Sequence, residues 1–313
     1  MFQQGRFFGR RSRANLLGSG SAGLGDNAAR REPYPRTVPT ASTIEQPESD
    51  KALSAAAVAA ALGARAGAFS VDVRQTCGSS NDELIGLAEA GATHRTVLAC
   101  DLQTAGRGRR GRDWIAAPQG SLTFSLLWRF PPASASPPGL SLAIGVAVAR
   151  VLEAAGAPGI ALKWPNDILL GGRKLAGILV DLLPTQEAAP AAVIGIGLNV
   201  TLPPDFPHDQ FDAADLAAVL PQPPSRNLLL AQLLIELDGA LTIFGRSGFT
   251  AFRESWLARH ALQDARVRLS GERETVEGIC RGVDQDGALL LETPAGLRRI
   301  ISGDVSLRPD AGH

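Results

Sequence analysis

The sequence predicts an α/β or α+β domain followed by a small β-barrel module. Between residues 69 and 257, strand-like segments alternate with segments of helical periodicity, as in a domain whose helices pack on a sheet. Between residues 262 and 308, the strands become short and closely spaced, with Ser-Gly, Asp-Gly and Ala-Gly turns. Residues 1–50 are rich in Gly, Ser, Arg and Pro, and we expect them to be disordered.

The elements follow in order from these patterns. An alanine-rich stretch at 51–66 is expected to be helical, and 201–224 contains enough breakers to predict a long loop. Residues 121–130 are apolar on both faces, as in a central strand, and Gly171 with Gly172 indicates a hairpin. Further strands are predicted at 96–101, 160–163, 167–170, 174–183, 191–200, 265–270, 274–283, 287–292 and 297–302. Further helices are predicted at 81–90, 139–155, 226–245 and 248–258.

Composition excludes several classes of protein. Lys+Arg and Asp+Glu both number 31, so the whole chain is not a basic nucleic-acid binder, although residues 1–37 are rich in arginine. Three cysteines without a C-x-x-C pair fit a reducing cytoplasm better than a disulfide framework. The apolar stretch Leu140–Leu152 is shorter than the ~20 residues of a membrane-spanning helix, and the N-terminus lacks the apolar core of a secretory signal.

Residues 103–114 contain a loop in which glycines alternate with arginines. These are Gly106, Gly108, Gly111, Arg107, Arg109, Arg110 and Arg112. Glycine allows close approach of the backbone to a ligand, and the arginine fork matches carboxylate and phosphate oxygens. A flexible cationic loop at a strand end suits an anion that is enclosed during a reaction. The loop alone is equally consistent with an RGG-like RNA-binding patch or with a solvated basic loop.

A second motif joins Lys163-Trp164-Pro165-Asn166-Asp167 to the strand that begins at Arg173. Lys174 lies in an apolar strand, where burial is costly unless the ammonium meets an anion. Gly177 would leave room for a ligand beside the sheet. Asp167 could hold Mg²⁺, whereas the alternative is that Asp167 and Asn166 only stabilise a turn.

A third motif is the glycine-containing strand at 195–200. It lacks the third glycine and the following helix of a dinucleotide-binding fingerprint. Glycines within a strand more plausibly permit close approach of a ligand.

Taken in order, four motifs resemble those of biotin protein ligases (biotin–acetyl-CoA-carboxylase ligases). They are GRGRRGRDW, KWPNDI, RKLAGILVD and GIGLNV, and the similarity covers most of residues 70–308. The resemblance implies an α+β fold, with a catalytic domain like that of class II aminoacyl-tRNA synthetases and a C-terminal SH3-like barrel. The catalytic sheet is then expected to be mixed and largely antiparallel. The expected division is a disordered extension at 1–50, a catalytic domain at 51–260 and the barrel at 261–310.

The resemblance also implies the site residues. Those expected at biotin are Ser79, Ser80, Asn81, Gln103, Arg107, Gly108, Arg109, Lys174 and Gly177. Those expected at ATP are Gly106, Arg110, Trp114, Asn166, Asp167, Asn199 and Phe211, with Phe211 on adenine and Asp167 on Mg²⁺. Lys174, Arg107 and Arg109 are expected to be catalytic. Trp114, Leu175 and Ile178 are expected to form an apolar wall. Ser80 replaces the threonine that is usual in the family.

The implied activity is AMP-forming ligation, in which ATP activates biotin as biotinyl-5′-AMP and the biotinyl group passes to a lysine. The expected acceptor is the biotin carboxyl carrier protein of acetyl-CoA carboxylase, and Mg²⁺ is the expected metal. Residues 1–50 have too little apolar periodicity for a winged helix-turn-helix, so the resemblance points to the monofunctional form. We expect a cytoplasmic monomer or weak homodimer with no nucleic-acid or membrane partner. The alternatives are a lipoate–protein ligase, which the arginine-glycine loop and the barrel disfavour, a nucleic-acid-binding module, and a catalytically dead scaffold.

Overall fold

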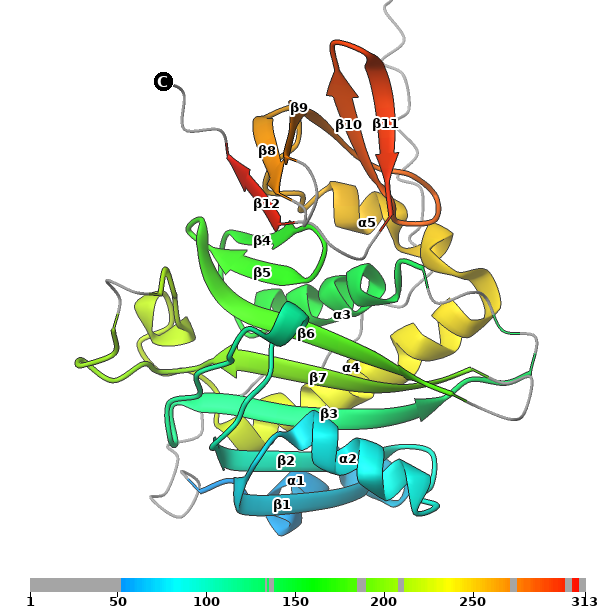
Figure 1. Ribbon diagram of the computed structural model, residues 1–313. Helices are drawn as coiled ribbons and strands as arrows, with labels where there is room; N and C mark the ends of the chain where they lie inside the picture. The colour runs from blue at the N-terminus through cyan, green and yellow to red at the C-terminus, as the bar shows by residue number, and fades with distance from the viewer. Residues whose placement is uncertain are drawn as a thin grey trace, which may run out of the picture. The chain divides into compact units, whose positions relative to one another are not determined.

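The structure is a computed structural model that describes residues 52–132, 134, 138–184, 190–207, 211–270, 275–301 and 306–309. The predicted disordered extension at 1–50 lies outside the described residues. Two β-sheets and the helices that pack on the larger sheet make up this part of the chain (Figure 1).

The larger sheet has seven strands in the order β1-β2-β3-β7-β6-β5-β4. Only β1 and β2 are parallel, and every other neighbouring pair is antiparallel. The fold class is therefore confirmed as α+β with a mixed, largely antiparallel sheet. The bounds are β1 Ser70–Cys77, β2 Thr96–Gln103, β3 Ser121–Arg129, β4 Ile160–Lys163, β5 Asp167–Leu170, β6 Arg173–Leu183 and β7 Ala191–Asn199.

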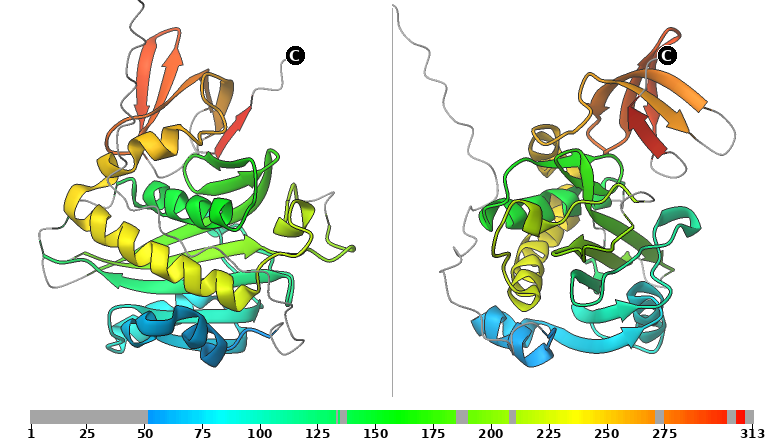
Figure 2. Two further views of the ribbon diagram at one scale, coloured as in Figure 1. Left: turned by 180° about the vertical axis from the view of Figure 1, so that it is seen from behind. Right: turned by 90° about the vertical axis from the view of Figure 1, so that its left-hand side faces the viewer.

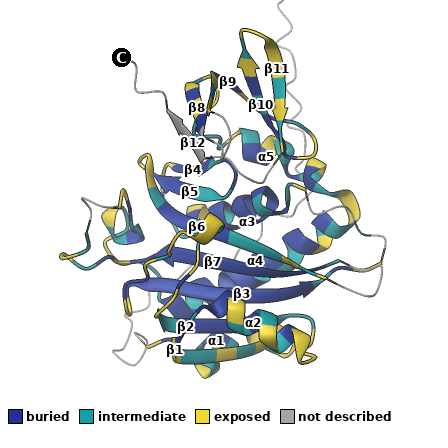
Figure 3. Ribbon diagram, in the orientation of Figure 1, coloured by how far each residue is buried: buried dark blue, intermediate teal, exposed yellow. Residues whose placement is uncertain are grey.

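The centre of this sheet has two chemically different faces. Strands β3 and β7 are buried almost throughout (Figure 3). Successive side chains of a strand point to opposite faces, so the alternation in β3 and β7 separates large apolar residues from small or polar ones. One face carries the apolar set: Leu122, Phe124, Leu126, Ile194, Ile196 and Leu198. The other carries the small or polar set: Ser121, Thr123, Ser125, Gly195, Gly197 and Asn199.

Helices cover the apolar face. The helices α3 (Leu140–Ala154) and α4 (Arg226–Ser247) pack on each other behind the sheet as it is seen in Figure 1, and α1 (Ala55–Leu62) packs on α4 (Figure 2). The contact at α3 is close, because a Cβ at Gly145 would lie 3.7 Å from the Ile178 side chain on β6. Helix α2 (Ser80–Glu89) packs near one end of the opposite face, through Leu84 against Leu127 and Val193. The rest of that opposite face is left for a ligand.

The second sheet contains five antiparallel strands in the order β11-β10-β9-β8-β12. Its bounds are β8 Arg266–Ser270, β9 Thr275–Val283, β10 Leu289–Thr293, β11 Gly296–Ile300 and β12 Ser306–Pro309. Val267, Cys280 and Leu289 are fully buried in it. The predicted C-terminal β-module is thus confirmed, with β12 as a strand that the sequence patterns missed. Trp164 joins the sheets, since its Nε1 donates to the Gly287 carbonyl at 3.1 Å.

Several element boundaries differ from the predictions. Strand β1 was not predicted, and the helix expected at 51–66 is the shorter α1 followed by a 3-10 turn at Gly63–Ala68. The helix expected at 248–258 divides into a 3-10 turn at Phe249–Ala251 and α5 at Arg253–Leu257, with Phe252 between them.

Helix α4 is longer than the apolar stretch at 140–152 that was compared with a membrane-spanning helix. Among the described residues, this one 22-residue helix has the length and hydropathy of a membrane span, but 61% of its most apolar window is buried. Its packing against α1 and α3 identifies it as a core helix of this fold.

Candidate active site

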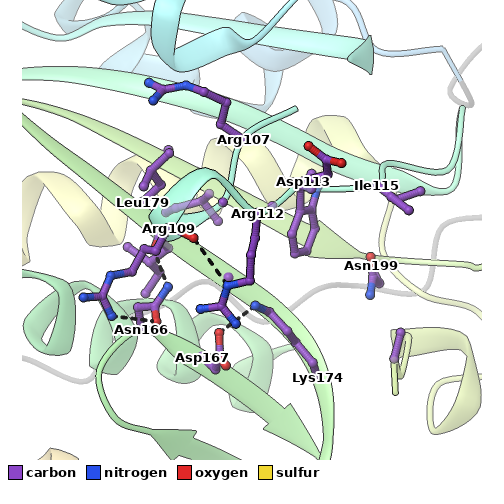
Figure 4. Close-up of a pocket in the computed structure, with 18 of the residues that line it drawn as sticks. Arg107, Arg109, Arg112, Asp113, Ile115, Asn166, Asp167, Lys174, Leu179 and Asn199 are labelled. Atoms are coloured by element: carbon purple, nitrogen blue, oxygen red, sulfur yellow. Dashed lines mark hydrogen bonds and ion pairs between the residues drawn. The ribbon is translucent and has the colours of Figure 1, made fainter. Parts of the chain in front are cut away.

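A cavity of about 700 Å³ lies on the small and polar face of the large sheet. Strands β6 and β7 form its floor, the start of α2 closes one end, and Phe206 and residues 211–213 close the other. The arginine-glycine segment 104–114, which we call the flap, crosses above the strands (Figure 4). The face that helices leave uncovered is therefore the one that carries the predicted motifs.

The flap is folded back on itself. Its two arms are joined by hydrogen bonds from Gly108 N to Arg112 O at 2.6 Å and from Trp114 N to Gly106 O at 2.8 Å. The turn between them places Arg110 at φ 62°, a left-handed conformation that is uncommon outside glycine. Gly106 cannot carry a side chain, because a Cβ there would lie 2.4 Å from the Trp114 carbonyl oxygen. The base of the flap thus depends on a glycine, and its tip presents arginines.

The cations predicted to be catalytic, Arg107, Arg109 and Lys174, all line this one cavity. Lys174 Nζ lies 2.7 Å from Asp167 Oδ1. The anion that was predicted to meet the Lys174 ammonium is therefore present in the protein itself, as the Asp167 carboxylate. The Lys174 side chain is 39% exposed, and its ammonium is accessible to a ligand as well. Arg109 Nη1 lies 3.5 Å from Asn166 Oδ1, and Arg112 points toward the same end as Lys174 (Figure 4).

Trp114 occupies the space that the strand glycines leave. A Cβ at Gly197 would lie 2.3 Å from Trp114 Cε2, and a Cβ at Gly177 would lie 3.3 Å from Trp114 Cζ3. The Lys174 ammonium lies 5.7 Å from the centre of the indole ring, a cation–π distance. In this structure the flap tryptophan lies against both glycines, which also line the cavity, and their contact with a ligand stays a prediction. Within the described residues, the buried Trp114 Nε1 has no hydrogen-bond partner.

One end of the cavity is built at the start of α2. Ser79 caps this helix, with its hydroxyl 3.4 Å from Asp82 N. The Ser80 backbone N–H donates to Gln103 Oε1 at 2.7 Å, which fixes the orientation of that side-chain amide. The buried Asn81 completes a polar cluster at this end, where the sequence predicts biotin.

The other end is built from β7, Phe206 and residues 211–213. Asn199 is buried, and its Nδ2 donates to the Ala214 carbonyl at 3.1 Å. Its Oδ1 is buried without a hydrogen-bond partner in the described part of the chain. Phe206 and Phe211 lie near it, with ring centres 6.2 Å apart. Phe211 was predicted to lie on adenine, whereas Phe206, which lies in the same proline-rich segment, was not predicted to line the site.

Most of the predicted site residues line the cavity, and two do not. Gly106 lies buried at the base of the flap, and Arg110 is exposed at its tip. In the expected apolar wall, Leu175 is fully buried away from the cavity, and Ile178 borders it with a side chain that reaches α3. Lining residues for which the sequence predicts no role include Arg112, Asp113, Ile115, Leu169, Leu179, Phe206 and Asp212. The roles of the predicted residues stay predictions.

Asp167 has one feature in favour of a Mg²⁺ role and one against it. Mg²⁺ in nucleotide sites is usually held by one or two carboxylates together with phosphates, and Asp167 lines the cavity near three cations. However, its carboxylate is engaged by Lys174. No group of three or more His, Cys, Asp or Glu side chains that could hold a metal occurs in the described residues. An ion here would therefore depend on the phosphates of the substrate.

Comparison with known proteins identifies two family models in the chain. Residues 79–199 match the biotin/lipoate A/B protein ligase family, and residues 265–308 match the biotin protein ligase C-terminal domain. The first match spans the start of α2 through the end of β7, which includes every strand that borders the cavity.

Curated relatives agree with these matches. The bifunctional ligase/repressor BirA of Salmonella typhimurium is 37% identical over 68% of this chain and 68% of its own length. The biotin–[acetyl-CoA-carboxylase] ligase of Mycobacterium tuberculosis is 36% identical over 78% of this chain and 91% of its own. The corresponding ligase of Paracoccus denitrificans is 34% identical over 72% and 96%.

A solved structure extends the similarity to three dimensions. The biotin protein ligase of Aquifex aeolicus, in complex with biotin and ATP, superposes with a TM-score of 0.66 at 27% identity. The match covers 77% of this chain and 99% of that one. With two family models, curated relatives above 30% identity and this fold in common, the chain belongs to the biotin protein ligase family.

Proposed function

We propose that this chain is a biotin–[acetyl-CoA-carboxylase] ligase that activates biotin with ATP and transfers it to a carrier lysine. The observation that carries the proposal is the convergence of Arg107, Arg109 and Lys174 on one cavity of about 700 Å³. That volume falls within the ~300–1,000 Å³ of small-molecule sites. Cations from a flap and a strand around one hollow suit a reaction between two anions, because they offset the repulsion between carboxylate and triphosphate.

The two ends of the cavity suit the two substrates. Ser79 and Gln103 provide polar groups for the ureido ring of biotin, and Leu179 provides apolar wall. At the other end, Asn199 and Phe211 line the cavity, and adenine would lie beside the Phe211 ring. The biotin carboxylate and the α-phosphate then meet near Lys174 and Arg109.

In the first step, a carboxylate oxygen of biotin attacks the α-phosphorus of ATP. A new P–O bond forms, the bond to the β-phosphate breaks, and pyrophosphate leaves with its charge. Negative charge increases on the phosphoryl oxygens in the transition state, where Lys174 and Arg109 stabilise it. Magnesium, held mainly by the phosphates and by Asp167, would supply further charge neutralisation.

In the second step, the neutral amine of the carrier lysine attacks the acyl carbon. An amide forms, AMP leaves, and the lysine nitrogen loses a proton. Until then the mixed anhydride must be protected from water. The flap is suited to this task, because Trp114 at its base packs on Gly197 and its arginines lie over the cavity.

Labelled pyrophosphate exchange tests the proposal. The purified full chain should exchange pyrophosphate into ATP with biotin and not with lipoate, and it should transfer labelled biotin to a purified biotin carboxyl carrier domain only with ATP. Exchange with lipoate alone would replace the proposal with the lipoate–protein ligase alternative. Omitting Mg²⁺ and adding a chelator should abolish exchange if the metal is required.

We further propose that the chain is a cytoplasmic ligase without repressor activity. The ligases of Mycobacterium tuberculosis and Paracoccus denitrificans, which are named for ligase activity alone, align over 91% and 96% of their own lengths. A DNA mobility-shift assay with the full chain should detect no sequence-specific complex. Sedimentation with and without biotin and ATP should report a monomer or a weak homodimer.

A further inference from the structure

Asp181, on β6, contacts two of the residues at the biotin end without lining the cavity itself. Its Oδ2 accepts from Asn81 Nδ2 at 2.9 Å and lies 3.3 Å from Arg107 Nη2 of the flap. We propose that Asp181 is a positioning residue that fixes the amide of Asn81 and attaches the flap to the sheet through Arg107. This inference deepens the proposed function and rests on it.

The amide of Asn81 lies across three strands. Its Oδ1 is 2.5 Å from the Ser125 hydroxyl on β3, and its Nδ2 reaches Asp181 on β6. Between them lies Gly195 on β7, where a Cβ would be 2.2 Å from Asn81 Oδ1. Ser125, Gly195 and Leu179 are direct register partners across β3, β7 and β6, so the amide follows one row of the sheet.

Loss of the Asp181 carboxylate would leave this amide poorly held. The remaining acceptor for Nδ2 is the Leu179 carbonyl at 3.5 Å, which is beyond the usual range for an N–H···O hydrogen bond. Asn81 is buried, so its unpaired N–H would bear a desolvation cost. The amide would then rotate or shift, and the polar surface offered to biotin would change.

Arg107 has two acidic partners: its guanidinium lies closer to Asp82 than to Asp181, and the two carboxylates differ in exposure. The Asp82 side chain is 52% exposed, whereas Asp181 is 29% exposed. An exposed ion pair contributes little because water screens it. Asp181 is paired through β6 with Val193 of β7, whereas the ladder between β5 and β6 ends at Gly177. The less exposed carboxylate, which is carried by this sheet strand, is therefore the fixed point for the flap.

Asn81 Nδ2 and Arg107 Nη2 both contact Oδ2 of Asp181, so removal of this carboxylate affects the biotin end and the flap and not the ATP end. Asp181→Ala should raise the KM for biotin by about tenfold, because both contacts are lost. The KM for ATP should change less than about twofold, since Asn199 and Phe211 lie at the other end. Asp181→Asn keeps an acceptor for the Asn81 amide and removes the charge that holds Arg107. It should therefore raise the rate of adenylate release more than the KM for biotin.

The matched control is Asp82→Ala, which removes the more exposed partner of the same arginine. It should change the KM for biotin and adenylate release by less than about twofold. Asp181→Glu, which restores the charge at the cost of one methylene, should recover part of the loss in each parameter. In the Arg107→Ala background, Asp181→Asn should add nothing to adenylate release.

Limited trypsin digestion without ligands gives a readout that does not depend on ligase activity. Cleavage after the flap arginines, located by mass spectrometry, should be severalfold faster in Asp181→Asn than in wild type or Asp82→Ala. The inference is wrong if flap cleavage and the KM for biotin are both unchanged. It is also wrong if both KM values rise equally while the melting temperature falls, since that pattern marks a structural role. If flap cleavage accelerates but the wild-type chain shows no biotin-dependent exchange, the proposed function fails while the attachment of the flap stands.

Discussion

The contact between Trp114 and Gly197 makes a sharp prediction for Gly197→Ala. The new Cβ would lie 2.3 Å from Trp114 Cε2 and 2.4 Å from Cζ2. Ordinary carbon contacts are about 3.5–4.0 Å, so the indole must move by more than about 1 Å. Gly197 lies in a strand and its φ is not in the left-handed region, so alanine suits the backbone. The strain must fall on the flap, which is the less constrained partner.

The expected magnitude follows from the cost of overpacking. A clash of this kind costs about 1–3 kcal/mol, which corresponds to an about 5- to 150-fold decrease in the closed population of the flap. We therefore expect Gly197→Ala to release biotinyl-adenylate at least about fivefold faster. The melting temperature should be unchanged or about 2–4 °C higher, because alanine is favoured over glycine within a strand.

The assay is a chase of enzyme-bound labelled adenylate without carrier protein, together with a thermal melt. Gly177→Ala is a milder perturbation, since its Cβ would lie 3.2 Å from Lys174 Cε and Nζ and 3.3 Å from Trp114 Cζ3, which requires shifts of only a few tenths of an ångström. Because Lys174 is also contacted, the rate of adenylate formation is measured alongside adenylate release in this variant. In a Trp114→Ala background, Gly197→Ala should have no further effect on release. Additive effects of the two substitutions would refute the reasoning, because the clash needs both side chains.

Three further predictions concern charge. Lys174→Ala should lower the rate of adenylate formation, measured as pyrophosphate release, by about 10²–10³-fold with an unchanged melting temperature; a wild-type rate would remove Lys174 from the mechanism. Burial, assisted by a neighbouring guanidinium, lowers the pKa of His94 below 6.5, and its ring Nδ1 accepts from Arg129 N at 3.1 Å. The stability from the neutral ring is present above pH 6.5 and lost as pH falls through the lower folded-state pKa. The fall in melting temperature from about pH 7.5 to about pH 5 should therefore be smaller in His94→Gln than in wild type, and an equal fall would contradict this. Arg226→Ala should destabilise the fold by about 3–5 kcal/mol in a denaturant titration, because Asp101 loses its buried partner; a loss below about 1 kcal/mol would contradict it.

Local patterns predicted most of the fold. Strands β4 and β5 have the predicted bounds, since short apolar runs are bounded there by Pro165 and by the Gly171-Gly172 turn. Strand β1 was missed although Val71 and Val73 alternate with charged residues. It is an edge strand whose side chains are mostly exposed or half-buried, so few of its positions require an apolar residue and the apolar run is short.

The site was predictable where a motif carried it and not where tertiary contacts decide it. Lys174 and Arg109 were named from their motifs, and both line the cavity. The packing of Trp114 on Gly197 was not predicted, because it depends on how far the flap folds back over a strand that is more than 80 residues away in sequence. The ion pair between Asp181 and Arg107 was not predicted for the same reason, because each residue, judged from its neighbours in sequence, resembles a solvent-exposed surface charge.

The two-sided alternation of β3 and β7 also has an evolutionary consequence. Side chains that face the cavity and side chains that face the helices occupy alternate positions of the same strands, so a change at 197 or 199 acts on the flap or the ligand without altering the buried apolar layer. A single inserted residue would have the opposite effect, because it would exchange the two sides beyond the insertion. Isoleucine side chains would then point into the cavity, and the glycines would face the helices. Relatives should accordingly tolerate substitutions in these strands far better than insertions or deletions.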